Sequence, residues 1–454
     1  MRKPSWFITD KAFYKNLLSL ALPISLQNLV TFAVNFADNV MVGTLGEVDI
    51  SAVYLCRQLA TVLQCFMNGI GTGLLVLCAQ YYGKKNFEAI RKIVAIAFRL
   101  ALGLGIVYSV SAILFARPIL SLLTREQAVI EAGLPYLRIT GVSFFFFCIT
   151  SLFIYALRSV ENAKLGMRLS FLTLFVNIIF NYVFIFGNFG APKLGITGAA
   201  IATLIARMAE TAVALVYVFR CEKVIAMRPA WLFRLRDKLL LSDLLKYGIP
   251  IFLGEMVWSF NMLYQSFIIG RYDDKIMAAF SITIMMSNLV YVWAMGLASA
   301  VGIITGKTVG EGKLDEMKRI AATVQVLFVF VGIFSGLLIF ALKGPFIGLY
   351  NVSGVTKTAA DTLMNVLCFV MAGTCYQMVG LSGLVKSGGD TAFVTVNDSI
   401  HVFLIIVPSA YLCYKLGAPV WATFLALKCD QILKCFVAVV KINRYKWMKK
   451  IVRD

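Results

Sequence analysis

The chain contains two copies of one apolar unit, and the second copy follows the first at a distance of 227 residues. Without a gap, this shift places Pro23 on Pro250 and Gly43 on Gly270. It also aligns small residues, namely Ala52 with Ala279, Gly69 with Gly296 and Gly83 with Gly310. These residue types decide where a helix bends and where a turn forms. Two copies bent at a matching place predict a transporter whose halves rock about a site near the middle of a membrane.

The composition excludes a soluble domain. Hydrophobic residues make up 60% of the 454 residues, and the mean hydropathy is +0.83. No water-soluble fold can bury that much apolar surface. The net charge is +20, from 43 Lys and Arg against 23 Asp and Glu. The basic residues lie in short gaps between apolar runs, which is typical of membrane proteins and argues against a nucleic-acid partner.

Twelve apolar runs are long enough to cross a bilayer. They begin near Leu17, Ile50, Ile93, Ile130, Leu165, Gly195, Leu244, Ile276, Arg319, Val355, Thr391 and Ala418. Twenty-nine Lys and Arg, including Arg2 and Lys3, lie in the termini and the even-numbered gaps, whereas eight lie in the odd-numbered gaps. This asymmetry predicts that both termini are cytoplasmic. Because each copy holds six spans, the two copies insert with the same orientation.

We therefore expect an all-α polytopic membrane protein with twelve transmembrane helices in two parallel-repeat lobes of six. The predicted N-lobe covers residues 1–225 and helices 1–6. The predicted C-lobe covers residues 226–454, with a cytoplasmic linker, helices 7–12 and a basic C-terminal tail. The linker is expected to lie partly on anionic lipid. We expect the protein in the cell membrane, in contact with lipids and as a monomer.

Asp38 is the first candidate for a residue that binds the coupling ion and the substrate. It lies inside the first apolar run, fifteen residues after Pro23 and toward the outer end. A carboxylate within a membrane is costly, and such residues are functional by default. Desolvation favours the protonated form and a bound cation favours the ionised form, so one site can serve two competing occupants. The alternative is a structural acid that is hydrogen-bonded to Asn35 or Asn39.

Glu255 is the second candidate. It lies about eleven residues into the seventh run, which places it near mid-depth at ~1.5 Å per residue. The repeat places it opposite Asn28. One interpretation is a second ion or proton site in the C-lobe. The alternative is an acid that packs the lobe through hydrogen bonds to Asn261 or Tyr264, and the sequence does not separate the two.

Small polar residues are candidates to line a cavity beside Asp38. Asn177 and Asn181 are four residues apart and therefore share one face of the fifth helix. Hydrogen bonding between helices is the alternative role for such side chains. The predicted lining consists of Gln27, Asn28, Asn35, Asn177, Asn181 and Thr203.

The two repeat-related prolines are candidate hinges. Pro23 and Pro250 lie early in the first and seventh helices, where a bend can absorb a conformational change. The alternative is a tolerated bend without motion. The ten cysteines lie mostly inside apolar runs and form no CxxC motif, so we expect free thiols and no metal site.

Other charged residues have a structural explanation. Arg207 with Glu210, and Lys428 with Asp430, are interpreted as structural ion pairs near the cytoplasmic face. Asp398 opens the eleventh helix close to His401, the only histidine. A lone histidine near a helix end is more often a packed residue than a proton relay.

The sequence resembles the multidrug and toxic compound extrusion (MATE) family, within the multidrug/oligosaccharide-lipid/polysaccharide flippase superfamily. The resemblance covers nearly the whole chain and rests on four segments in the right order. They are LALPISLQNLV, residues 38–46, the run from Asn177 to Thr203, and the tail residues Asp430, Lys434, Arg444, Lys446 and Trp447. The resemblance implies a V-shaped pair of six-helix lobes that expels cationic amphiphiles in exchange for H⁺ or Na⁺.

Two positions depart from the patterns of the family. Several relatives carry an acid on the fifth helix, where this chain has Asn181. Another branch uses acids on the seventh and tenth helices, where this chain has Trp258 and Cys375. Glu255 lies three residues before Trp258, nearly one turn away on a similar face. The chain therefore departs from the sodium-type site of that branch.

The first hypothesis for function is a secondary antiporter that exports organic cations in exchange for H⁺, or for Na⁺, by alternating access. Its partners are small amphiphilic cations, and no cofactor beyond the coupling ion and no catalytic residue is expected. The alternative is a flippase for a lipid-linked precursor, which favours a strongly cationic cavity; the buried cations here are few beyond Arg57, Arg99 and Arg138. The sequence lacks the loop motif of major-facilitator carriers and any enzyme motif.

Overall fold

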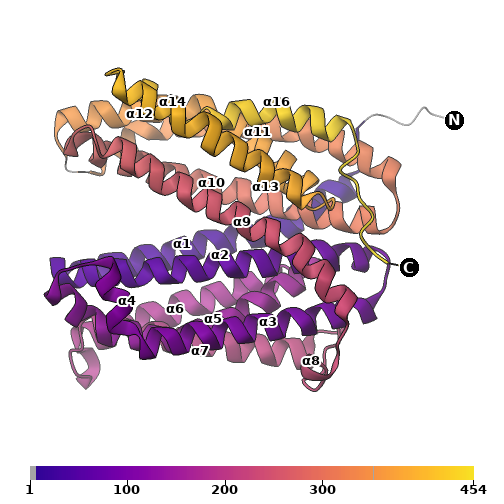
Figure 1. The fold of residues 1–454 in the computed structure, drawn as a ribbon, viewed down its shortest axis with the longest axis horizontal. Coiled ribbons are helices and arrows are strands. Elements are labelled where there is room, and N and C mark those ends of the chain that lie inside the picture. Colours follow the sequence, from indigo (N-terminus) through magenta and orange to yellow (C-terminus); the bar gives the residue numbers. More distant parts are fainter. Residues whose placement is uncertain (1–6, 351, 454) are drawn as a thin grey trace. The chain divides into compact units, whose positions relative to one another are not determined.

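The computed structural model describes residues 7–350 and 352–453, and these residues contain helices but no β-strand (Figure 1). Arg2 and Lys3 of the predicted cytoplasmic tail lie outside the described residues. In lipid every backbone N–H and C=O needs an internal partner, which a helix supplies within one segment. Long apolar runs in this chain therefore form helices, and the predicted all-α fold class is confirmed.

The first half of the chain runs from α1 to the linker. Its elements are α1 (Lys11–Gly43), α2 (Glu47–Gly83), α3 (Phe87–Leu114), α4 (Ala116–Leu123), α5 (Gln127–Ser159), α6 (Lys164–Phe186), the 3₁₀ turn η1 (Asn188–Gly190), α7 (Ile196–Val216) and the π-helical segment η2 (Tyr217–Cys221). Turn residues set these bounds: the Asn86 side chain accepts a hydrogen bond from the Ala89 backbone and starts α3.

The second half repeats this order with more irregular helices. Its elements are α8 (Trp231–Arg234), α9 (Lys238–Ile269), α10 (Asp274–Gly310), α11 (Leu314–Gly348), α12 (Gly354–Gln377), the π-helical η3 (Met378–Val385), α13 (Thr391–Ile400), the π-helical η4 (His401–Ile406), α14 (Val407–Lys415), α15 (Val420–Lys428) and α16 (Asp430–Asn443). Among the described residues, ten segments are long and apolar enough to cross a membrane. The other two predicted runs correspond to α9 and to α15 with α16.

The repeat is visible in the backbone of the turns. Lys85 and Gly312, one shift apart, both have positive φ angles, of 58° and 75°. Glu161 and Gly389 occupy the corresponding turns after α5 and η3, with φ angles of 63° and 102°. Residues other than glycine rarely adopt this left-handed backbone conformation. Matching left-handed positions show that the two copies share turn geometry even where their residues differ.

The chain forms two compact units. Each unit consists of most of one copy together with the beginning of the first helix of the other copy. We call Leu26–Phe252 the N-unit, and Met1–Ser25 together with Leu253–Asp454 the C-unit. The breaks after Ser25 and Phe252 are 227 residues apart, the repeat distance, and each lies two residues beyond a helix-bending proline. The predicted lobe boundary between residues 225 and 226 stays a prediction.

Glycines allow close packing at both break points. A Cβ on Gly69 of α2 would lie 2.7 Å from the Cβ of Phe252 on α9. A Cβ on Gly296 of α10 would lie 2.8 Å from the backbone nitrogen of Ser25 on α1. These two contacts are related by the repeat, one within each unit. Only glycine permits helices to approach this closely.

Candidate functional site

Asp38 lies in the last third of α1 and is buried, with 8% of its surface exposed. Its Oδ1 accepts a hydrogen bond of 2.6 Å from Asn181 Nδ2 on α6. Its Oδ2 lies 3.2 Å from Arg57 Nη2 on α2. Three helices of the N-unit therefore meet at one carboxylate, and both of its oxygens have a partner.

Arg57 is the residue that sequence reasoning did not connect with Asp38. It also donates to Asn39 Oδ1, and its side chain keeps 27% of its surface exposed. Tyr136 of α5, which is 6% exposed, lies within electrostatic range of both Arg57 and Asp38. The alternative interpretation of Asp38 had Asn35 or Asn39 bonded to it; Asn39 instead accepts a hydrogen bond from Arg57, which also bonds Asp38. Arg57 is thus a tethered cation beside the candidate coupling residue.

Asn177 and Asn181 are brought to the site as their spacing on one helix face predicts. Asn181 Nδ2 also donates to Asn177 Oδ1, at 3.0 Å. Asn181 is 0% exposed and Asn177 is 2% exposed. The buried Asn181 Oδ1 has no hydrogen-bond partner within the described residues. An unused acceptor beside Asp38 costs free energy unless a donor arrives. It is suited to a protonated carboxyl group or to a cationic N–H.

The other predicted lining residues are not bonded to this group. Within residues 7–350 and 352–453, no recorded hydrogen bond joins Asn28, Asn35 or Thr203 to Asp38, and Asn35 is exposed. Gln27 lies eleven residues before Asp38, about 16 Å along the helix. These four residues remain predictions as cavity residues.

Gln27 belongs to a second polar group of the N-unit. Its Oε1 accepts a hydrogen bond of 2.6 Å from Arg158 Nη2 on α5. Nearby on the same helix, Tyr155 donates to Asn68 Oδ1 at 3.0 Å, and Gln64 of α2 donates to the same oxygen at 2.8 Å. Arg158 Nε is buried without a partner among the described residues. The guanidinium is therefore held by a neutral amide.

The C-unit places its charges on other helices. Lys434 Nζ on α16 lies 2.8 Å from Asp398 Oδ1 on α13 and 3.1 Å from Asp430 Oδ2. The prediction paired Asp430 with Lys428; this was wrong, because residues 430 and 434 are one turn apart on one helix face, whereas Lys428 precedes the break at Cys429. The i, i+4 spacing of Asp430 and Lys434 is the sequence signal that could have predicted this pair. The predicted Arg207–Glu210 pair is present, at 2.6 Å.

Glu255 and His401 flank this region of the C-unit. Glu255 lies on α9 and is half-buried, and its neighbour Gly254 packs against Thr395 of α13. Tyr264, one of the two partners that the packing alternative gave to Glu255, donates to the Val407 backbone carbonyl at 2.7 Å. His401 Nδ1 lies 2.8 Å from the Asn397 carbonyl, and the ring is 5% exposed. This geometry favours a packed histidine.

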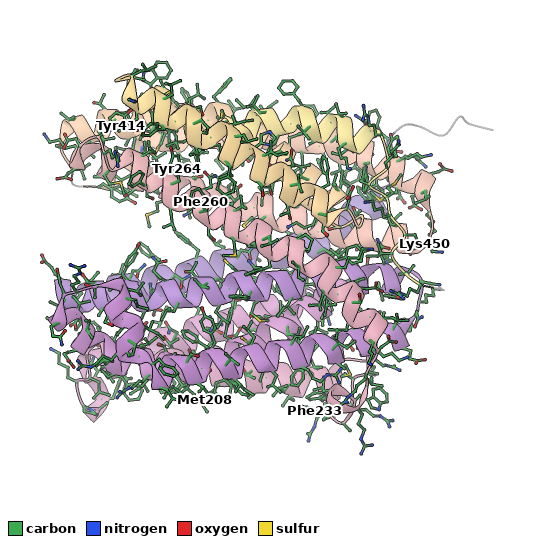
Figure 2. The ribbon with its side chains drawn as sticks, in the orientation of Figure 1. Met208, Phe233, Phe260, Tyr264, Tyr414 and Lys450 are labelled. Atoms are coloured by element: carbon green, nitrogen blue, oxygen red, sulfur yellow. The ribbon has the colours of Figure 1, made fainter. Side chains whose placement is uncertain are left out.

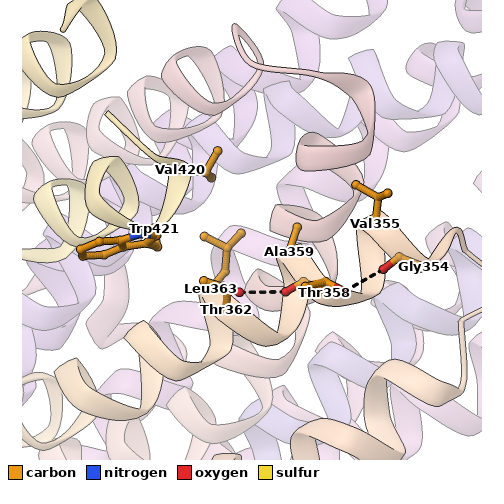
Figure 3. A pocket seen from close by; sticks show the side chains of 8 residues that line it. All are labelled: Gly354, Val355, Thr358, Ala359, Thr362, Leu363, Val420 and Trp421. Atoms are coloured by element: carbon orange, nitrogen blue, oxygen red, sulfur yellow. Dashed lines mark hydrogen bonds between the residues drawn. The ribbon is translucent and has the colours of Figure 1, made fainter. Parts of the chain in front are cut away.

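A separate pocket of about 520 Å³ lies where α12 and α15 begin (Figure 3). It is lined by Gly354, Val355, Thr358, Ala359, Thr362, Leu363, Val420 and Trp421. The hydroxyls of Thr358 and Thr362 donate to carbonyls of their own helix, at 3.0 and 2.9 Å. Such bonds leave little polarity for a ligand. The pocket is apolar and holds none of the predicted site residues.

The comparisons with known proteins agree with the duplicated architecture. The MatE family model matches residues 23–183 and 250–412. The chain is similar to the probable multidrug resistance protein NorM of Halalkalibacterium halodurans, with 27% identity over 427 residues, covering 90% of this chain and 89% of that protein. It is similar to the probable multidrug resistance protein YoeA of Bacillus subtilis, with 25% identity over 404 residues, covering 88% of this chain and 86% of that protein.

A solved structure shows the same fold. The crystal structure of the Vibrio cholerae MATE transporter VcmN in the bent form matches with a TM-score of 0.86 and 16% identity, over 96% of this chain and 97% of that chain. The two family matches begin 227 residues apart, at the repeat-related prolines. The repeat found in the sequence is therefore a repeat of the family unit.

Proposed function

We propose, from the premise that this chain belongs to the MATE family of multi-pass membrane transporters, that it exports small organic cations in exchange for H⁺ by alternating access. Na⁺ is the second candidate for the coupling ion. The names of the relatives, which are multidrug resistance proteins, support efflux of drugs. The observation that carries the proposal is the buried Asp38, which is bonded to one cation and one amide.

In this proposal, three positive species compete for one carboxylate. Arg57 is the resident occupant of Asp38, and a proton or an organic cation takes its place during transport. Protonation removes the charge that holds Arg57, while binding of a cationic substrate requires the ionised carboxylate. Two ligands that exclude each other at one site give exchange. The partnerless Asn181 Oδ1 supplies a further acceptor for either form.

The test is transport into everted membrane vesicles under separately imposed H⁺ and Na⁺ gradients, with ethidium as the substrate. We expect a proton gradient to drive uptake, and Asp38→Asn to abolish it while folded protein remains in the membrane. We also expect binding of ethidium to release protons from the unmodified protein and not from Asp38→Asn. The matched control is Glu47→Gln, an exposed acid at the start of α2.

Proton release that persists in Asp38→Asn and vanishes in Glu255→Gln would place coupling in the C-unit. The N-unit mechanism would then be wrong. Uptake driven only by the Na⁺ gradient would keep Asp38 as the binding residue and change the coupling ion.

A flippase for an anionic lipid-linked precursor is the second candidate. The observation that favours it is Arg158, which forms no ion pair within the described residues, donates to the Gln27 amide and lies over the Tyr155 ring, 5.8 Å from its centroid. A buried guanidinium without a carboxylate suits an anionic group. Ethidium efflux that survives Arg158→Gln would favour the antiporter, whereas flipping of a lipid-linked precursor that fails in this variant would favour the flippase.

We propose that the protein resides in the cell membrane with both termini in the cytoplasm. Single cysteines at Asp49, Lys193 and Lys415, in a chain without its native cysteines, are expected to react with an external reagent. Cysteines at Lys85, Arg234 and Lys450 are expected to be protected. Labelling of the residue at position 234 from outside would contradict the orientation. Pro23 and Pro250, beside the points where the chain passes between units, are the proposed hinges.

A further inference from the structure

The C-unit contains a buried group of charges that the N-unit mechanism does not use. Asp398, Lys434 and Asp430 form a triad in which one ammonium bridges two carboxylates, at 2.8 and 3.1 Å. The exposed fractions of their side chains differ: 30% for Asp398, 8% for Lys434 and 2% for Asp430. Asp398 is therefore the only member that a ligand can reach without moving the others.

The triad carries one more negative charge than positive charge. Lys428 lies within electrostatic range of Asp430, but within the described residues its recorded contact is with the Phe424 ring, and no ion pair joins it to the triad. Asp430 Oδ2 accepts from both Lys434 and Gln431, whereas Asp430 Oδ1 is buried and has no hydrogen-bond partner in the part of the chain that the structure describes. A buried carboxylate with an unused acceptor is unfavourable, and a further donor relieves it.

The unpartnered oxygen also gives Lys434 a second place to bind. If its ammonium leaves Asp398, both oxygens of Asp430 remain available to it. Asp398 would then be accessible and without its cation. The geometry of the triad thus allows an exchange in which an incoming cation replaces Lys434 at Asp398 while Lys434 stays paired with Asp430.

Exposed aromatic side chains lie about one helical turn along the chain from Asp398. Phe403 lies about one turn beyond Asp398 and its ring centroid is 5.2 Å from that of Phe260 on α9. Phe260 is in turn stacked near Tyr264, at 6.3 Å, and both are labelled on α9 in Figure 2. Phe260 is 42% exposed and Phe403 is 47% exposed. An aromatic face attracts an organic cation, so rings one turn away from a carboxylate favour organic cations over small inorganic ions.

The helix itself is irregular at this point. Residues His401–Ile406 form the π-helical η4, which begins directly after α13. The corresponding helix of the first copy, α6, is regular over Lys164–Phe186. Short π segments that interrupt α-helices are frequent at functional positions. The π-helical segment thus begins three residues after Asp398 and contains Phe403.

We propose that Asp398, with Phe260 and Phe403, forms a second site for monovalent organic cations, in which Lys434 is a tethered occupant that the ligand displaces. The site goes beyond the proposed coupling role of Asp38 and lies wholly within the C-unit. Its ligand class is an aromatic or alkyl ammonium, whose charge replaces that of Lys434 and whose apolar part rests on the phenylalanine rings.

The test is equilibrium binding of ethidium to the purified full chain in lipid nanodiscs, in an Asp38→Asn background that removes the N-unit carboxylate. We expect this protein to retain ethidium binding, and Asp398→Asn to weaken it about tenfold or more, the effect of one lost charge-assisted contact. The matched control is Asp361→Asn, because Asp361 forms a similar pair with Lys343, at 2.8 Å, elsewhere in the C-unit. The control is expected to bind as its parent does.

A second variant separates the ligand site from a purely structural triad. Lys434→Met combined with Asp430→Asn removes the competing ammonium and the charge it balances, so Asp398 stays as the one acid. We expect this variant to bind ethidium more tightly than its parent, by about tenfold. Unchanged affinity in both Asp398→Asn and the double variant would overturn the proposal. Since no gradient is used, failure of cation export would leave this binding result intact.

Discussion

The two units share their backbone turns but differ in where they bury charge. Under the repeat shift, Asp38 falls on Gln265 and Arg57 falls on Ile284, so the ion pair of the N-unit has neutral counterparts in the C-unit. Asp398 in turn falls on Ser170 when the turns after α5 and η3 are aligned. The positions that the copies share determine where helices end and where two helices pack closely against each other. The chemistry lies where the copies have diverged.

The two ion pairs also differ in their contact with solvent. Arg57 and Asp38 keep side-chain exposures of 27% and 12%, whereas Lys434 and Asp430 keep 8% and 2%. The drier pair is more costly to break, because the remaining charge cannot be solvated. The N-unit pair is accessible enough for exchange at low cost. Coupling is therefore assigned to the N-unit pair, whereas the exchange proposed for the C-unit leaves the Lys434–Asp430 pair intact and breaks only the contact of Lys434 with the more exposed Asp398.

The largest effect is expected from removing the buried ammonium. Lys434→Met leaves Asp430 buried with an uncompensated charge and should lower the free energy of unfolding by about 3–5 kcal/mol. Arg57→Met, the matched change in the N-unit, should cost about 1–3 kcal/mol, because Asn181 still donates to Asp38. Thermal unfolding in detergent, followed by circular dichroism, measures both. Equal losses would contradict the assigned difference in burial.

The next effect tests what the units share. Gly69→Ala and Gly296→Ala each place a Cβ within 3 Å of another helix and should each cost about 1–3 kcal/mol. The losses should be similar, because the repeat relates the two contacts. Gly103→Ala, at a glycine of α3 with nothing within 4 Å of the added Cβ, is the control and should be neutral or stabilising. A large loss at only one of the two contacts would break the symmetry.

Much of the fold could be predicted because it depends on local pattern and on the repeat. Apolar runs gave the spanning helices, and the spacing of Asn177 and Asn181 gave their common face toward Asp38. The partner Arg57 was not predicted, because it depends on how far α2 slides along α1. Asp398 and Lys434 are 36 residues apart on different helices, and no short-range pattern connects them.

A third prediction concerns the pH dependence of efflux. Asn181→Asp places a second carboxylate against Asp38, where the amide nitrogen now donates at 2.6 Å. Two acids that share a site cannot both ionise freely, so one proton is held to higher pH. We expect the pH optimum of ethidium efflux to move up by about one unit. Gln265→Asp, at the C-unit position that the repeat relates to Asp38, should leave the optimum unchanged. A shift there as well would mean that both units couple.

The smallest effect on stability is expected at the turn that precedes α13. There the C-unit has the titratable Asp390, whereas the N-unit has Asn162. Asp390 accepts hydrogen bonds from Lys441 Nζ and Lys449 Nζ, at 2.8 and 2.9 Å, whereas its counterpart Asn162 donates to Tyr217 Oη at 3.0 Å. Burial opposes ionisation of Asp390, but the two ammonium groups outweigh it and hold the pKa of Asp390 below its ordinary value.

Because this pKa is lowered by folding, the ionised Asp390 contributes stability above the pKa of the unfolded chain and loses it as pH falls through the folded value. Asp390→Asn should therefore loosen the C-terminal tail at neutral pH, by about 1 kcal/mol after allowance for solvent screening. Amide exchange at Lys449, whose N–H donates to the Gly388 carbonyl at 2.9 Å, reports on the tail. The difference from the unmodified chain should vanish in acid. Asn162→Ala, which has no titrating group to lose, should show a difference independent of pH; a constant difference for Asp390→Asn would mean that the aspartate acts by shape and not by charge.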